Sequence, residues 1–273
     1  MTVPAFCEPV WTDVTNSRSD PVRAAVRRQV DLAVVGAGIM GLSTAFHAAQ
    51  AGMKVQVIEA GRIGSGASGL NGGQVIPGLK YDPEWLLEKF GARQGERLVD
   101  FVAHAADAVF DLIRDQKLEV PHNRNGWIQA CHTETALLAA QARFRQWNAR
   151  GADVAMLDDA AVEKLVGTSN YHGGFLDRRA GLINPLAYTL ELARIAREAG
   201  AAISDNIACR RLEKRQDGWT LALSDGTEIQ AKSVIVATNA YSANLVPGLS
   251  RSLVGLHSFQ IATAPLSEHL IRD

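Results

Sequence analysis

This chain is poor in cysteine and carries no excess of basic charge. Its 273 residues include 3 cysteines, Cys7, Cys131 and Cys209, which lie far apart in the sequence. An odd number at such spacing predicts neither a disulfide framework nor a metal site, and a reducing, cytoplasmic setting is expected. Lys and Arg total 28 against 29 Asp and Glu, a formal charge of −1. Such a surface neutralises few phosphates, which argues against nucleic acid as the main partner.

The sequence also lacks a long uninterrupted hydrophobic run. Its longest apolar stretch, residues 32–58, is broken by glycines and by His47, Gln50 and Lys54, whereas a membrane-spanning helix needs about 20 consecutive apolar residues. The N-terminus has no basic flank, and Glu8 interrupts its only apolar segment, so no signal peptide is predicted. With 47% hydrophobic and 21% charged residues, the chain is expected to fold into one large domain or about two smaller ones.

Regular structure is predicted to begin after an N-terminal arm, residues 1–29. Residues 31–35 are apolar and β-branched, residues 39–51 are rich in helix formers, and residues 54–58 are again β-branched. This order predicts a strand–helix–strand unit with a parallel, right-handed crossover.

Further elements are predicted from periodicity and turn signals. The predicted helices cover residues 98–113, 135–150 and 185–199, and the last begins at an Asn184-Pro185 cap. Strands are predicted at residues 127–131, 203–212, 219–223, 228–231, 233–238 and 259–264, with Asp225-Gly226 as a hairpin turn.

Three glycines stand between the first predicted strand and helix. Gly36 permits a tight turn, Gly38 lets a pyrophosphate approach the backbone, and Gly41 allows close helix–strand packing. The phosphates would lie at the helix N-terminus, where unpaired N–H groups carry roughly half a positive charge. Glu59, at the end of the second strand, can accept hydrogen bonds from both ribose hydroxyls. The pattern favours dinucleotide binding over a plain glycine-rich turn.

A second glycine-rich segment, residues 64–74, follows Glu59. Its sequence, GSGASGLNGGQ, has small side chains and many backbone N–H groups, which suit an extended polar ligand. A flavin dinucleotide, whose ribityl chain and ring extend past the pyrophosphate, makes use of such a loop, whereas a nicotinamide dinucleotide has no obvious need of it. The alternative is a flexible surface loop.

Together these motifs resemble the FAD-dependent oxidoreductases of the D-amino-acid oxidase (DAO) superfamily, and most of all its gamma-glutamylputrescine oxidoreductase-like branch. The likeness starts with residues 31–77. Further stretches fit the same branch, so it extends over nearly the whole chain from residue 31: residues 177–200 with AGLINP, residues 234–241 (VIVATNAY) and residues 258–266 (SFQIATAPL).

The resemblance implies FAD as cofactor and a set of residues that hold it. The glycine turn would cradle the pyrophosphate, Glu59 the ribose, and Arg62 and Ser68 would lie beside the adenosine or phosphates. Residues 71–74 would pass near the flavin ring. Cys209, which is also typical of a small buried residue, would lie on the strand facing the adenine. The implied set is Gly36, Ala37, Gly38, Ile39, Met40, Gly41, Glu59, Ala60, Arg62, Ser68, Asn71, Gly72, Gly73, Gln74, Cys209, Ala237 and Thr238.

The implied fold is α/β, with a Rossmann-like FAD-binding domain and a discontinuous α+β substrate domain that is incomplete at the C-terminus. The first has a parallel sheet, helices on both faces and a β-hairpin or meander insertion. Relatives continue beyond Asp273, so the chain is expected to be a fragment or a shortened protein. Predicted limits are residues 30–83 and 178–248 for the FAD-binding domain, and 84–177 and 249–273 for the substrate domain.

The implied activity is oxidation of the C–N bond of an amine or amino acid. Hydride transfer to flavin N5 would give an imine that hydrolyses to an aldehyde or keto acid, and oxygen or another acceptor would take the electrons. The sequence assigns no catalytic acid or base; Arg124 and Tyr171 are the residues considered for a substrate carboxylate. Two alternatives stay open: an NAD-dependent dehydrogenase, and a truncated FAD-binding remnant without catalysis. The specific amine and the oligomeric state are not specified.

Overall fold

The computed structural model describes residues 11, 25–242, 244–256, 263, 266–267 and 269. The chain divides into two compact units: unit 1 comprises Met1–Gly72 and Asn184–Ala262, and unit 2 comprises Gly73–Ile183 and Thr263–Asp273. Most of the predicted arm, and the predicted strand at residues 259–264 apart from Thr263, lie outside the described residues. These boundaries describe the packing of the chain, and the domain limits given in the sequence analysis stay a prediction.

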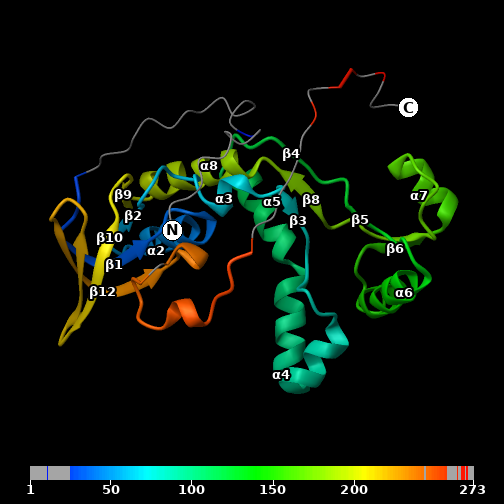
Figure 1. Ribbon diagram of the computed structural model, residues 1–273, viewed down its shortest axis with the longest axis horizontal. Helices are drawn as coiled ribbons and strands as arrows, with labels where there is room; N and C mark the ends of the chain where they lie inside the picture. The colour runs from blue at the N-terminus through cyan, green and yellow to red at the C-terminus, as the bar shows by residue number, and fades with distance from the viewer. Residues whose placement is uncertain are drawn as a thin grey trace. The chain divides into compact units, whose positions relative to one another are not determined.

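Unit 1 is built on a six-stranded sheet in the order β10-β11-β12-β1-β2-β9 (Figure 1). Four strands run parallel to one another: β12 (Glu228–Val236), β1 (Gln29–Val35), β2 (Val55–Ile58) and β9 (Ala202–Ser204). At one edge, β11 (Gly218–Leu223) and β10 (Cys209–Arg215) continue from β12 as an antiparallel meander. The mixed α/β fold with a meander insertion is therefore confirmed.

The predicted strand–helix–strand unit is present as β1, α2 (Ile39–Gln50) and β2. Val35 pairs with both Ile58 and Val236, so the carboxyl ends of β1, β2 and β12 lie level at one edge of the sheet. In an open parallel sheet, ligands bind at this edge.

The two faces of this sheet pack against different parts of unit 1. Helices α2 and α8 (Pro185–Glu198) pack against each other, and the Val34 side chain points towards Gly41 of α2. Neighbouring residues of a strand face opposite ways, and Ala33 and Val35 accordingly join a buried cluster with the meander residues Leu221 and Ile229. This second face therefore shares its buried core with the meander.

Two strand predictions in unit 1 are wrong. The predicted strand at residues 203–212 is two strands, β9 and β10, at opposite edges of the sheet. The chain leaves the sheet between them at Asn206, whose φ is 55°; asparagine tolerates this left-handed conformation better than most residues. Conversely, the strands predicted at residues 228–231 and 233–238 form the single strand β12, which runs unbroken through Lys232.

In its described residues, unit 2 contains two small antiparallel sheets and four helices of at least eight residues. The core contains Leu86, Trp147 and Phe175. The predicted single helix at residues 98–113 is wrong, because α4 and α5 meet at His104, whose ψ of 6° ends the first helix. The elements are β3 (Gln74–Val75), α4 (Pro83–Ala103), α5 (Ala105–Asp115), β4 (His122–Asn123), β5 (Trp127–Ala130), α6 (Glu134–Asn148), β6 (Val154–Leu157), α7 (Asp159–Val166), β7 (Gly174–Asp177) and β8 (Gly181–Ile183).

None of the helices in the described residues has the length and apolar character needed to cross a bilayer.

The start of α8 follows the predicted cap. The Asn184 side chain accepts a hydrogen bond of 3.0 Å from the Ala187 backbone N–H, and Pro185 occupies the first turn. This cap satisfies one of the helix N–H groups that have no partner within the helix.

Replacing Asn184 with Ala should lower the free energy of unfolding by about 1 kcal/mol, because the Ala187 N–H loses its acceptor. Asn184→Ser, which keeps a capping oxygen, should lose clearly less. Urea unfolding followed by circular dichroism measures both values. Equal losses in the two variants would show that the cap does not contribute.

Candidate functional site

The turn between β1 and α2 brings backbone segments together too closely for side chains. Gly36 has φ +107°, and a Cβ atom there would lie 2.9 Å from the Ala237 carbonyl oxygen. A Cβ on Gly41 would lie 2.0 Å from the Gly36 oxygen. The Ala237 N–H donates to the Val35 oxygen at 2.8 Å, which holds the end of β12 against this turn. Glycine is therefore required at Gly36 and Gly41 for packing alone.

Gly38 has a different neighbour. It is the N-cap of α2, and a Cβ atom there would lie 2.6 Å from Ser68 Oγ. Ser68, on the short helix α3 (Ala67–Leu70), accepts a hydrogen bond of 3.0 Å from the Ile39 N–H. Because Ile39 is the first residue of α2, its N–H is one of those that an anion at a helix N-terminus would use. The Ser68 hydroxyl therefore lies where a phosphate oxygen is expected.

Glu59 connects the turn between β1 and α2 to the turn that follows β2. One carboxylate oxygen accepts the Ala37 N–H at 2.7 Å and the other accepts the Gly61 N–H at 2.9 Å. The backbone of Glu59 is fixed by β9 and the link that follows it, since its N–H donates to Ser204 O and its carbonyl accepts the Ile207 N–H, both at 2.9 Å. The carboxylate is thus half-buried and directed at the glycine turn.

The segment after Glu59 folds back against α8. A Cβ on Gly69 would lie 2.1 Å from the Gly64 oxygen, and one on Gly64, whose φ is +76°, would lie 2.9 Å from Leu186. Asn71 ends α3, and its Nδ2 donates to Ala67 O at 3.1 Å and to Ser68 O at 2.9 Å. This glycine-rich segment is therefore a packed element rather than a flexible loop.

The described structure brings together most of the predicted cofactor residues of unit 1. Gly36, Ala37, Gly38 and Ile39 meet Glu59, Ser68 or Ala237 through the contacts above, and Gly41 packs against Gly36. Thr238 follows Ala237, with its Oγ1 2.7 Å from Ser242 Oγ. The other predicted residues of unit 1 are more accessible to solvent. Met40, Ala60, Arg62 and Asn71 are exposed, and Gly72 is half-buried.

Gly73 and Gln74 belong to unit 2, where Gly73 is buried and Gln74 begins β3.

Sequence reasoning missed two residues of this site. Gly61 supplies an N–H to Glu59, and the Tyr241 ring lies against Gly66, where a Cβ would come within 3.3 Å of Tyr241 Cε2. The only available signal for Tyr241 was its place at the end of the VATNAY string. Gly61 gave none, because a single glycine after a strand has many structural uses.

Cys209 is the first residue of β10, and it packs with the buried cluster between sheet and meander. Burial raises the pKa of its thiol to about 11, although a hydrogen bond to the Arg211 backbone opposes the shift. A thiol that stays protonated at neutral pH is a poor nucleophile and metal ligand. The geometry agrees with a small packing residue.

Unit 2 holds both residues that were considered for a substrate carboxylate. Arg124 is already engaged: it pairs with Asp107, donates from Nε to Arg179 O at 3.0 Å, and lies 4.8 Å from the centre of the Phe110 ring. Two of its five N–H donors are therefore used within unit 2, and its charge is already paired with the Asp107 carboxylate.

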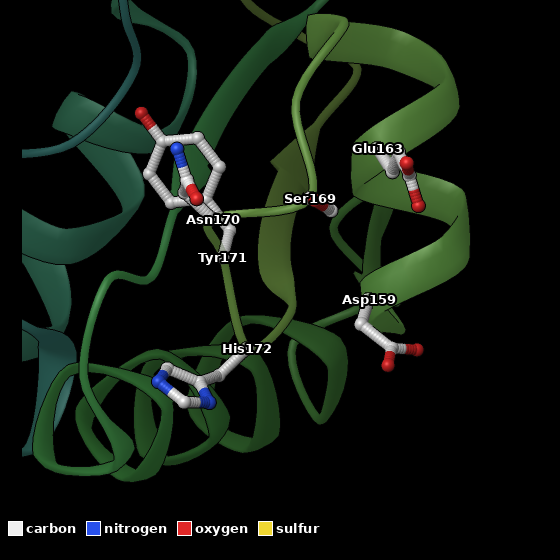
Figure 2. A pocket seen from close by; sticks show the side chains of 6 residues that line it. All are labelled: Asp159, Glu163, Ser169, Asn170, Tyr171 and His172. Atoms are coloured by element: carbon white, nitrogen blue, oxygen red, sulfur yellow. The ribbon is translucent and has the colours of Figure 1, made fainter.

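Tyr171 lines a pocket of about 450 Å³ with Ser169, Asn170 and His172. Figure 2 shows that Asp159 and Glu163 reach this pocket from α7. Two carboxylates disfavour a second negative charge there, so the pocket is not suited to a substrate carboxylate. No cluster of metal-ligating side chains occurs among the described residues.

The residues of unit 1 fit a diphosphate-bridged dinucleotide. Backbone N–H groups at the start of α2, a turn that a side chain at Gly38 would fill, and a carboxylate at the neighbouring strand end are the three parts that such a ligand needs.

Comparison with known proteins gives the same result for the fold. Residues 31–273 match the family described as FAD dependent oxidoreductase (DAO). Gamma-glutamylputrescine oxidoreductase of Escherichia coli (strain K12) is 30% identical over 245 residues, which make up 89% of this chain and 57% of that protein. The chain therefore spans little more than half the length of this relative.

Two solved structures share the fold. Glycine oxidase from Geobacillus kaustophilus superposes with a TM-score of 0.67 at 21% identity, over 84% of this chain and 60% of that one. L-amino acid deaminase from Proteus vulgaris gives 0.68 at 20% identity, over 83% and 51%.

Gly38→Val should weaken FAD binding about a hundredfold. The valine side chain would displace Ser68 and fill the space beside the Ile39 N–H, and losing two charge-assisted hydrogen bonds of about 1.5 kcal/mol each gives this factor. Titration of the apoprotein with FAD, followed by flavin fluorescence, measures the affinity. Gly255→Val is the matched control, because Gly255 has open space around it. Unchanged affinity in Gly38→Val would contradict the site.

Cys209 should react slowly with iodoacetamide at pH 8, and the rate should rise about tenfold per pH unit up to pH 10, because only the thiolate reacts. Peptide mass spectrometry, with free glutathione in the same solution as reference, measures the rate. Cys209→Ala should retain FAD as the parent does. Fast alkylation at pH 8, or loss of FAD in the variant, would overturn the packing role.

Proposed function

This chain belongs to the family of FAD dependent oxidoreductases, and from that premise we propose that it binds FAD at the β1–α2 turn and oxidises a carbon–nitrogen bond of an amine or amino acid. The observation that carries the proposal is the joint placement of Gly38, Ser68 and Glu59 around the N-terminus of α2. The second glycine-rich segment favours a flavin over a nicotinamide, because it extends the backbone surface beyond the phosphates.

The substrate class is inferred from relatives that act on carbon–nitrogen bonds. The names gamma-glutamylputrescine oxidoreductase, glycine oxidase and L-amino acid deaminase all describe compounds with an amine nitrogen. Since the chain covers 57% of the first relative and 60% and 51% of the two structures, the activity is proposed for a protein that contains this chain.

Each group of unit 1 has a distinct part in binding. Backbone N–H groups at the start of α2 would donate hydrogen bonds to the diphosphate. Ser68 Oγ, which accepts the Ile39 N–H at 3.0 Å, would give up this bond to a phosphate oxygen and donate its own O–H to the same phosphate. Glu59 would accept hydrogen bonds from the ribose hydroxyls while it keeps the Ala37 and Gly61 N–H groups. Thr238, at the end of β12, would approach the same phosphates.

Bound FAD supplies the redox chemistry, because its ring accepts a hydride from the carbon next to the nitrogen and leaves an imine that water hydrolyses. The chain's own contribution is orientation. Gln74 is the last residue of segment 71–74, which is proposed to pass the ring, and its amide can donate and accept hydrogen bonds. An amide shapes the site without transferring protons.

The purified chain should be yellow and hold one FAD, and its visible absorption should bleach when an amine substrate is added without oxygen. A panel of gamma-glutamylputrescine, glycine and L-amino acids tests this by anaerobic spectrophotometry. A colourless protein that binds NADH would instead indicate the dehydrogenase alternative. Tightly bound FAD that no member of the panel reduces would indicate a binding remnant without catalysis.

A further inference from the structure

We propose that Trp11, which precedes β1 in the chain, is a positioning residue for the flavin end of the bound cofactor and acts through its hydrogen bond to the backbone of Asn71. This inference rests on the proposed binding of FAD and adds to it a residue outside the set placed above in the cofactor site. Trp11 and Asn71 belong to unit 1, together with Glu59 and Ser68, so the inference needs no placement of unit 2.

Trp11 is bonded to a residue 60 positions further along the chain. Its indole Nε1–H donates to the Asn71 carbonyl oxygen at 2.9 Å, and its side chain is half-buried. The indole N–H can only donate, and it usually finds an acceptor when the ring is covered. Because Asn71 belongs to the glycine-rich segment 64–74, this bond attaches Trp11 to the segment proposed to hold the flavin.

The other polar groups of Asn71 are bonded to α3. Its backbone N–H donates to Ala67 O at 3.2 Å, and its Nδ2 donates to Ala67 O at 3.1 Å and to Ser68 O at 2.9 Å. These bonds hold Asn71 from the side of the diphosphate site, and none of them involves Trp11. The bond from Trp11 is made instead to the carbonyl, which belongs to the peptide that leads on to Gly72.

This bond sets the orientation of the peptide between Asn71 and Gly72. The C=O and N–H of a trans peptide lie in one plane and point in opposite directions, so the Gly72 N–H points away from the indole. It has no hydrogen-bond partner among the described residues and is available to a ligand. Glycine has little conformational preference of its own, and Gly73 follows with φ +74°. Local sterics therefore leave this peptide free to turn, and Trp11 holds it.

The peptide follows the diphosphate site along the same segment. Ser68 Oγ lies beside the Ile39 N–H, where a phosphate oxygen is expected. Asn71 comes one helical turn later, about 4.5 Å further along the axis of α3. FAD carries its ring on a ribityl chain beyond the diphosphate, so a cofactor that extends along this segment passes its phosphates first and the Asn71–Gly72 peptide next. Trp11 thus acts on the ring end, whereas Glu59 acts on the adenosine end.

The test compares FAD with ADP, which has the adenosine and the diphosphate but no ring. Trp11→Phe keeps an aromatic ring and removes the N–H donor. Because one net hydrogen bond is worth about a fivefold change in affinity, Trp11→Phe should weaken FAD about fivefold and leave ADP within about twofold of the parent. Calorimetric titration of the full-length apoprotein with each ligand gives both dissociation constants.

Trp219→Phe is the matched control. Trp219 on β11 is half-buried in the same unit, and its indole N–H has no hydrogen bond to a described residue, so this variant should leave both constants unchanged. Gly38→Val represents the diphosphate end and should weaken FAD and ADP alike. The visible absorption of bound FAD, which reports on the surroundings of the ring, should change in Trp11→Phe and stay as in the parent in Trp219→Phe.

The outcomes separate this inference from the proposed function. If Trp11→Phe binds FAD as tightly as the parent does, the positioning role of Trp11 is overturned while the binding of FAD stands. Equal weakening of FAD and ADP would also overturn it, because Trp11 would then act on the diphosphate end. A loss confined to the free energy of unfolding in urea would show a purely structural role. If the parent does not bind FAD, both proposals fail together.

Discussion

The candidate cofactor site depends on three parallel strands that end at the same level. Val35 is in register with Ile58 and Val236, so the next residues, Gly36, Glu59 and Ala237, leave the sheet side by side. Each departure is fixed by a backbone hydrogen bond to the neighbouring strand, from Gly36 to Ile58 and from Ala237 to Val35, both 2.8 Å long. Where the first segment meets the third, a Cβ atom on Gly36 would lie 2.9 Å from the Ala237 oxygen, so this position requires glycine.

The same arrangement explains how one carboxylate can hold both protein and ligand. Each oxygen of Glu59 accepts one backbone N–H, yet a carboxylate oxygen can accept two hydrogen bonds. The remaining positions are available to ribose hydroxyls without breaking the bonds to Ala37 and Gly61. Because both turns are already fixed, a dinucleotide would not have to order them on binding, and preorganisation of this kind improves affinity.

Sequence reasoning succeeded where the determining contacts are local. The β1–α2–β2 order, the Asn184 cap and the Asp225 turn all depend on residues within a few positions of one another, and the turn is closed by the Thr227 N–H donating to Asp225 at 2.9 Å. It failed where distant segments decide the outcome. Nothing near residues 203–212 indicates that β9 pairs with β2 while β10 pairs with β11, because apolar and β-branched residues suit either position.

Residue type was a poor guide in unit 2 for a related reason. Arg124 was considered because a guanidinium can bind a carboxylate, but Asp107, the Arg179 carbonyl and the Phe110 ring already occupy it. The sequence shows the charge of Arg124 but not these three contacts, because Asp107, Phe110 and Arg179 lie elsewhere in the chain and meet it only in the fold. Residue type therefore indicates which chemistry a side chain can perform, whereas the fold decides whether another group of the protein already uses it.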